Sequence, residues 1–250
     1  MQNQKPAPLK APACAIAGVL LTLGCCFSTG LCARATNLPD ARDVSPAPDA
    51  RLEAPTATNA TSLALILDTS GSMSEAVGSE GSKLDIAKSV LVDDFLPSLS
   101  DDLYLAFYRF RYGGALELAP LRRCGSLDAP KWLHREVVMS LALATEADGA
   151  TPIVGSLSHT RSVLAPLPGR KLVVLVTDGE ASDGNPETVI AELDANTKAG
   201  LETFVVGFNL GGQGAYLRDK LGDGKNYFAA NGGREPLLKA LASIAAALEK

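Results

Sequence analysis

The segment Asp68-Thr69-Ser70-Gly71-Ser72 carries a carboxylate and two hydroxyls at alternate positions of the chain. It follows residues 63–67, an apolar run whose composition and length predict a buried strand. Oxygen-bearing side chains are the ligands that hard cations prefer. The side chains of Asp68, Ser70 and Ser72 therefore predict half of a cation site at the end of this strand.

Two segments further along the chain offer more oxygen groups. Thr151 lies in the sequence Asp-Gly-Ala-Thr-Pro, which opens a predicted helix, and Asp178 follows a second apolar run, residues 172–176. Neither segment contains Cys or His, so its oxygen ligands favour Mg²⁺, Mn²⁺ or Ca²⁺ over zinc or copper. The predicted metal ligands are Asp68, Ser70, Ser72, Thr151 and Asp178. Some of them would act through water, which leaves one coordination position for an incoming acidic group.

The elements that must position these residues alternate along the chain. Six short runs predict strands: residues 63–67, 103–108, 115–118, 172–176, 203–206 and 226–229. Amphipathic stretches with helical spacing separate most of them. Ser82 and Asp85 predict a capping box, and Pro186 suits the first turn of another helix. This order predicts an α/β fold with an open, mostly parallel, doubly wound (Rossmann-like) six-stranded sheet, flanked by helices and with one short antiparallel edge strand.

Residues 63–67 and 172–176 are apolar throughout, as expected of central parallel strands that helices cover on both faces. Open parallel sheets bind ligands beyond the carboxyl ends of their strands, where the strand order reverses. We therefore expect Asp68 and Asp178 to lie at that edge of the sheet.

Three motifs together carry a resemblance to a known family. Asp68-Thr69-Ser70-Gly71-Ser72 resembles the DxSxS signature of von Willebrand factor type A (vWA) domains. Thr151 and Asp178, the latter in Thr-Asp-Gly, match the two other conserved loops of that family. The set is similar to a metal-ion-dependent adhesion site (MIDAS), and the resemblance covers about residues 61 to 249.

The resemblance implies a role for each ligand. Ser70 and Ser72 would bind the metal through their hydroxyls, and Thr151 would bind it when a partner is engaged. Asp68 and Asp178 would act mainly through bound waters and orient the serines. Because few carboxylates touch the ion, it would stay under-neutralised and attract an Asp or Glu from a partner protein. Such domains switch affinity by moving the last helix, although nothing in this sequence indicates that this chain does so.

The N-terminal 35 residues predict a secretory signal of bacterial type. A weakly basic start precedes the apolar residues 11–27, and Ala33-Arg34-Ala35 suits a signal peptidase. A retained membrane anchor is one alternative, because the apolar stretch is at the short end of what spans a bilayer. Lipidation at Cys25, which follows Leu21-Thr22-Leu23-Gly24, is the other. Residues 36–60, rich in Pro and Ala, predict a flexible linker, and residues 61–250 the vWA-like domain. The predicted location is periplasmic or secreted.

Charge and cysteine content narrow the function. Without residues 1–35 the chain keeps 20 basic and 28 acidic residues, a net charge of −8, which argues against nucleic acid as a partner. Of the five cysteines only Cys124 lies beyond residue 35, so no internal disulfide is expected in the domain. Arg122 and Arg123 could activate this thiol, but an incidental loop cysteine is the preferred interpretation.

The preferred function is an exported, metal-dependent protein-binding module for adhesion or assembly, and not an enzyme. A metal-dependent hydrolase is one alternative, but phosphate-loop and nucleophile-elbow motifs are missing and position 70 is Ser where a haloacid-dehalogenase-type site needs Asp. A triad drawn through His159 lacks a nucleophile motif. A structural subunit whose metal only stabilises loops is the other alternative. The sequence does not indicate the oligomeric state.

Overall fold

The computed structural model describes residue 38, residues 55–129 and residues 132–249, all within one compact unit, Ala35–Lys250. The predicted signal segment, its alternative lipidation at Cys25 and most of the predicted linker lie outside the described residues. The division of the chain into signal, linker and domain thus stays a prediction. In the part that the structure describes, no helix has both the length and the apolar character needed to cross a membrane.

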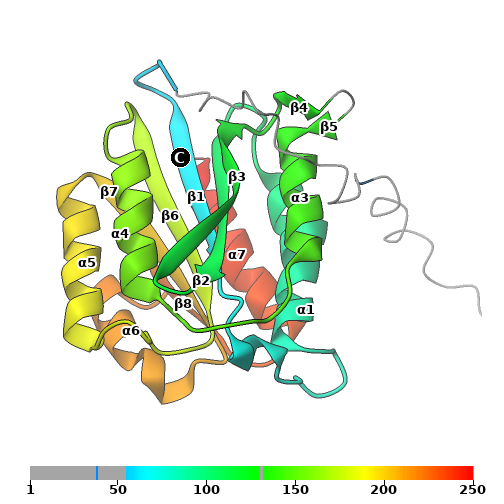
Figure 1. The fold of residues 1–250 in the computed structure, drawn as a ribbon, viewed down its shortest axis with the longest axis vertical. Coiled ribbons are helices and arrows are strands. Elements are labelled where there is room, and N and C mark those ends of the chain that lie inside the picture. Colours follow the sequence, from blue (N-terminus) through cyan, green and yellow to red (C-terminus); the bar gives the residue numbers. More distant parts are fainter. Residues whose placement is uncertain (1–37, 39–54, 130–131, 250) are drawn as a thin grey trace, which may run out of the picture. The chain divides into compact units, whose positions relative to one another are not determined.

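The described residues form a six-stranded sheet in the order β3-β2-β1-β6-β7-β8, with helices on both faces (Figure 1). Only the pairing of β2 with β3 is antiparallel in this sheet. The predicted fold class is therefore confirmed. The six strands are β1 (Thr61–Leu67), β2 (Tyr104–Arg111), β3 (Gly114–Arg123), β6 (Arg170–Thr177), β7 (Leu201–Phe208) and β8 (Tyr227–Ala230).

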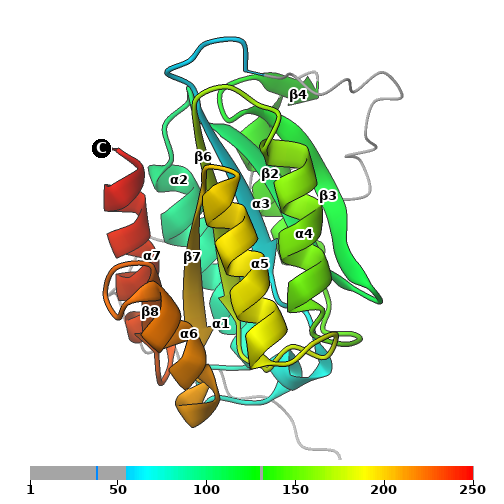
Figure 2. The ribbon, with the colours of Figure 1, turned by 90° about the vertical axis from the view of Figure 1, so that its left-hand side faces the viewer.

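Alternate residues of β1 face two separate hydrophobic cores. Leu63 and Leu65 pack into the core beneath α1 (Lys83–Val90), α3 (His134–Ala144) and α7 (Arg234–Leu248). Ala64 and Ile66 pack into the core beneath α4 (Ile153–Leu164) and α5 (Pro186–Lys198). Figure 2 shows α4 and α5 side by side on the second of these faces. All residues of β1 from Ser62 to Leu67 are buried, which explains why the strand carries no polar alternation.

The main helices are α1 (Lys83–Val90), α3 (His134–Ala144), α4 (Ile153–Leu164), α5 (Pro186–Lys198), α6 (Ala215–Leu221) and α7 (Arg234–Leu248). The predicted capping box is present, because Ser82 accepts a hydrogen bond from the Asp85 amide and the Asp85 carboxylate accepts one from the Ser82 amide. Pro186 occupies the first turn of α5 as expected. A π-helical segment (Leu91–Phe95) and the short α2 (Leu96–Ser98) extend α1.

Three details differ from expectation or were missed. The antiparallel edge strand β3 spans 10 residues and is not short. A small separate sheet of β4 (Leu127–Ala129) and β5 (Trp132–Leu133) was not predicted. Cys124 lies in the turn after β3 but is fully buried, and burial raises the pKa of its thiol to about 12. A raised pKa favours an unreactive thiol over activation by Arg122 and Arg123.

The strand order reverses around β1, because β2 lies on one side of it and β6 on the other, both parallel to it. Asp68 directly follows β1, and Asp178 directly follows β6. The two carboxylates consequently stand next to each other at the carboxyl edge of the sheet, as the sequence predicted.

Candidate functional site

Asp68 ties the ends of β1 and β6 together. Its side chain is buried, with one carboxylate oxygen accepting a hydrogen bond from the Ser70 amide at 2.7 Å. The other oxygen accepts the Thr177 hydroxyl at 2.6 Å and the Asp178 amide at 3.4 Å. These bonds fix the direction of the chain after β1, so that Ser70 and Ser72 follow in a defined position.

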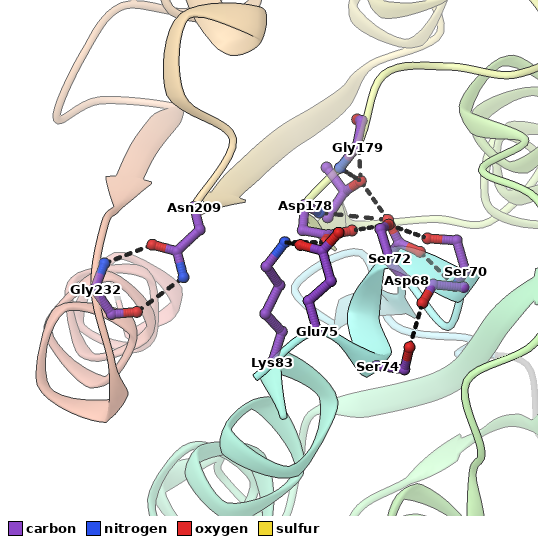
Figure 3. Close-up of polar contacts among 12 residues, drawn as sticks. Asp68, Ser70, Ser72, Ser74, Glu75, Lys83, Asp178, Gly179, Asn209 and Gly232 are labelled. Atoms are coloured by element: carbon purple, nitrogen blue, oxygen red, sulfur yellow. Dashed lines mark hydrogen bonds and ion pairs between the residues drawn. The ribbon is translucent and has the colours of Figure 1, made fainter. Parts of the chain in front are cut away.

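The two serine hydroxyls and Asp178 form a continuous chain of oxygen atoms (Figure 3). Ser70 Oγ lies 3.0 Å from Ser72 Oγ, and Ser72 Oγ donates to Asp178 Oδ1 at 2.8 Å. Neighbouring ligands of an octahedral ion with metal–oxygen bonds of roughly 2.1 Å are themselves about 3.0 Å apart. The 3.0 Å spacing of the two serine hydroxyls therefore fits two direct ligands of a hard divalent cation, and the hydrogen bond to Asp178 holds Ser72 in place.

Thr151 reaches the same place from the loop before α4. Backbone hydrogen bonds from Asp148 to Thr69 at 2.6 Å and from Gly71 to Gly149 at 3.2 Å join the two loops. A Cβ added at Gly179 would lie 3.3 Å from Thr151 Oγ1 and 3.9 Å from Ser72 Oγ. The structure thus brings all five predicted ligands together, in three loops that meet at the carboxyl edge of the sheet.

The five predicted metal ligands comprise three hydroxyl groups and two carboxylates. In the parts of the chain that the structure describes, no three or more His, Cys, Asp or Glu side chains form a group that could hold a metal. A cation here would depend on Ser70, Ser72 and Thr151, with Asp68 and Asp178 beside them. The predicted preference for oxygen-binding metals agrees with that composition.

Sequence reasoning missed a positively charged side chain, that of Lys83, next to this cluster. Lys83 Nζ lies 2.8 Å from Asp178 Oδ2 and 2.7 Å from Glu75 Oε2 (Figure 3). Partial burial acts to lower the pKa of the Lys83 ammonium, but its hydrogen bonds to Asp178 and Glu75 outweigh that effect and raise the pKa. Lys83 is 95 residues from Asp178 in sequence, and no local pattern signals the contact.

Asp183 and His159, which lie near the metal loops in sequence, have structural roles. The Asp183 carboxylate accepts the amides of Val154 at 3.1 Å and Gly155 at 2.7 Å, and so caps the first turn of α4. The His159 ring packs edge-on against Tyr108 of β2, with ring centroids 5.6 Å apart. These contacts give both residues a packing or capping function.

The metal dependence of stability should change with pH because of Asp68. Burial raises the pKa of this carboxyl above 3.8, with hydrogen bonds from Ser70 and Thr177 opposing part of the effect and the Asp178 charge adding to it. The folded state therefore takes up a proton at a higher pH than the unfolded state does. In metal-free protein, the buried charge of Asp68 lowers the free energy of unfolding. This destabilisation is lost as the pH falls through the raised pKa.

A divalent ion needs the ionised form, so its stabilising effect should shrink over the same pH range, above 3.8. Melting curves with and without Mg²⁺ at stepped pH between 7 and about 4 measure this effect. If the metal-dependent rise in melting temperature stayed constant down to the usual pKa of an Asp side chain, the role of Asp68 would be contradicted.

Comparison with known proteins identifies a relative. No protein-family model matches the chain. It is 30% identical over 186 residues to the uncharacterized protein YwmD of Bacillus subtilis, and the alignment covers 70% of this chain and 81% of YwmD.

Solved structures share the fold at low identity. A von Willebrand factor type A protein of Catenulispora acidiphila superimposes with a TM-score of 0.61 at 18% identity over 76% of this chain. The pilus adhesin SpaC of Lactobacillus rhamnosus GG gives 0.62 at 14% identity over 79%. Proximal thread matrix protein 1 of the mussel byssus, with zinc in its MIDAS motif, gives 0.58 at 17% identity over 76%.

The match covers 43%, 31% and 46% of these three solved chains, which is less than half of each. Identities this low show the fold and not the function. The 30% identity to YwmD extends over most of both chains. The chain therefore belongs to the same family as YwmD, and its fold is that of von Willebrand factor type A domains.

Proposed function

We propose that this chain is an exported protein-binding module for adhesion or assembly, in which a bound Mg²⁺ takes an Asp or Glu of a partner protein as its last ligand. The observation that carries the proposal is the chain of oxygen atoms from Ser70 through Ser72 to Asp178, spaced at 3.0 and 2.8 Å. An adhesin and a byssus matrix protein with a metal-filled MIDAS share the fold, which supports protein recognition as its use.

Each ligand has a distinct task in this proposal. Ser70 and Ser72 bind the ion directly, and Thr151 joins them when the partner is engaged. Asp68 and Asp178 act mainly through water and hold the serines in place, as their hydrogen bonds to the Ser70 amide and the Ser72 hydroxyl allow. The ion supplies a positive charge that neutral hydroxyls do not cancel, and this charge attracts a carboxylate.

Mg²⁺ is the proposed ion because all five ligands carry oxygen, and Mn²⁺ and Ca²⁺ are the alternatives. The zinc in the mussel protein makes Zn²⁺ a necessary comparison in any titration. Export to the periplasm or out of the cell is part of the proposal and rests on the N-terminal sequence. A retained anchor or a lipid on Cys25 would keep the same domain at a membrane.

Two alternative functions have less support. A hydrolase would need a nucleophile or base beside the metal, and His159, the histidine considered for that task, packs against Tyr108. A structural subunit would keep its partner when the metal is removed. That difference separates it from a metal-dependent binding module.

Partner capture with and without chelator tests the proposal. The chain, immobilised in Mg²⁺, is incubated with envelope extract of its source cells, and the bound proteins are eluted with EDTA. We expect a specific protein to be released by EDTA and to rebind when excess Mg²⁺ is restored. A partner that stays bound in EDTA would overturn the proposal and favour the structural role.

A further inference from the structure

Lys83 is held rigidly beside the candidate metal site. It is the first residue of α1, and its amide donates to the Glu75 carbonyl at 2.9 Å. Its side chain is only 11% exposed, and the Asp178 side chain that it contacts is fully buried. A buried ammonium paired at 2.8 Å with a buried carboxylate is therefore a fixed part of the site and not a mobile surface charge.

The charges around the site show what this ammonium does. Asp68 and Asp178 together carry two negative charges, which a divalent ion alone would neutralise. Lys83 adds a third positive charge at Asp178 and also pairs at 2.7 Å with Glu75, whose side chain is 65% exposed. With Glu75 counted, the ion and Lys83 together balance three carboxylates, so the ammonium competes with the ion for Asp178.

We propose that Lys83 is a built-in counter-cation of the metal site, which weakens metal binding by sharing Asp178. The inference deepens the proposed function and rests on it, because it concerns the same ligands. Asp178 accepts the Ser72 hydroxyl with one oxygen and the Lys83 ammonium with the other, so both of its oxygens have protein partners. Water-mediated contact with the ion is the mode that this arrangement favours.

Removing the charge of Lys83 should therefore tighten metal binding. Mn²⁺ alone is the probe, and the free Mn²⁺ signal in electron paramagnetic resonance gives its dissociation constant. We expect Lys83→Met to bind Mn²⁺ about tenfold or more tightly than the wild type, because a positive charge within hydrogen-bond distance of Asp178 is lost. Lys83→Arg, which keeps the charge, should bind about as the wild type does.

The direction of the change separates this role from a structural one. If Lys83 only held Asp178 in place, Lys83→Met would bind Mn²⁺ more weakly. Lys88→Met is the matched control, because Lys88 lies on the same helix and carries the same charge. Its Mn²⁺ affinity should stay within about twofold of the wild type. Circular dichroism melting checks that each variant is folded.

The outcomes also separate this inference from the proposed function. Equal Mn²⁺ affinity in wild type and Lys83→Met would overturn the inference and leave the metal site intact. Binding by Lys83→Met alone would overturn both proposals, because Lys83 would then take the place of a metal that the wild-type site does not bind. If neither protein bound Mn²⁺, both proposals would be wrong.

Discussion

Asp68→Ala should abolish the stabilisation that a divalent metal gives to this protein. At a metal concentration of 100 times the dissociation constant, a wild-type site adds about 2.7 kcal/mol to the free energy of unfolding. For a domain of this size that corresponds to a rise in Tm of about 5–10 °C. The variant should show no rise, because Asp68 joins the ends of β1 and β6 and orients Ser70.

Metal-free stability is a poor measure of this substitution, since two effects oppose each other. Losing the carboxylate leaves the Ser70 amide and the Thr177 hydroxyl without their acceptor, at about 1–3 kcal/mol for each donor. It also removes a buried charge whose cost is reflected in the raised pKa of Asp68. The difference between melting curves with and without metal avoids both effects.

The matched control is Asp102→Ala. Asp102 lies before β2, at the amino edge of the sheet, and its exposed carboxylate pairs with Arg123. This variant should keep the full metal-dependent rise in Tm. Titrations with Mg²⁺, Mn²⁺, Ca²⁺ and Zn²⁺ on wild type and both variants complete the experiment. An Asp68→Ala protein that still gained stability from Mg²⁺ would show that the metal binds elsewhere.

Sequence could predict the sheet edge because two signals agree there. Residues 63–67 and 172–176 are apolar without alternation, which only central parallel strands need, and each is followed closely by an Asp. In the structure, β1 and β6 are indeed adjacent and parallel. The antiparallel strand β3 was harder, because only residues 115–118 of its length gave a strand pattern and Pro120 interrupts it.

The charge environment of the site could not be predicted in the same way. Ser82 and Asp85 are three residues apart, so their capping box is a local pattern that sequence shows directly. The pairing of Lys83 with Asp178 joins residues 95 positions apart and depends on how α1 packs against the end of β6. Lys83, at the first position of a helix, gives no sign by itself that its side chain is buried.

Thr151→Ala should separate partner binding from folding. The Thr151 backbone is held on both sides, since its amide donates to the Ser182 hydroxyl at 3.0 Å and its carbonyl accepts the Ser182 amide at 2.9 Å. These bonds do not involve the Thr151 hydroxyl, so alanine should keep the loop in place. What the variant loses is the Thr151 hydroxyl oxygen, which lies 3.3 Å from the place that a Cβ added at Gly179 would take.

We expect Thr151→Ala to lose partner capture in Mg²⁺ while its metal-free melting temperature stays close to that of the wild type. Substituting a group that merely orients a metal ligand costs about 10–100-fold in metal affinity. Removing a ligand itself should cost at least as much, and the metal-dependent capture of the partner should fall with it. Thr151→Ser, which keeps the hydroxyl, should restore capture. Thr197→Ala removes a hydroxyl that bonds within α5, and should leave capture unchanged.

Quantitative capture at a series of partner dilutions compares the four proteins. If Thr151→Ala and Thr151→Ser bound the partner equally, the hydroxyl would have no part in recognition and the interface would lie away from the metal loops. If both lost binding, the β-methyl or the loop conformation would matter more than the oxygen atom. Loss in the alanine variant with recovery in the serine variant is the result that assigns Thr151 Oγ1 to the partner-bound state.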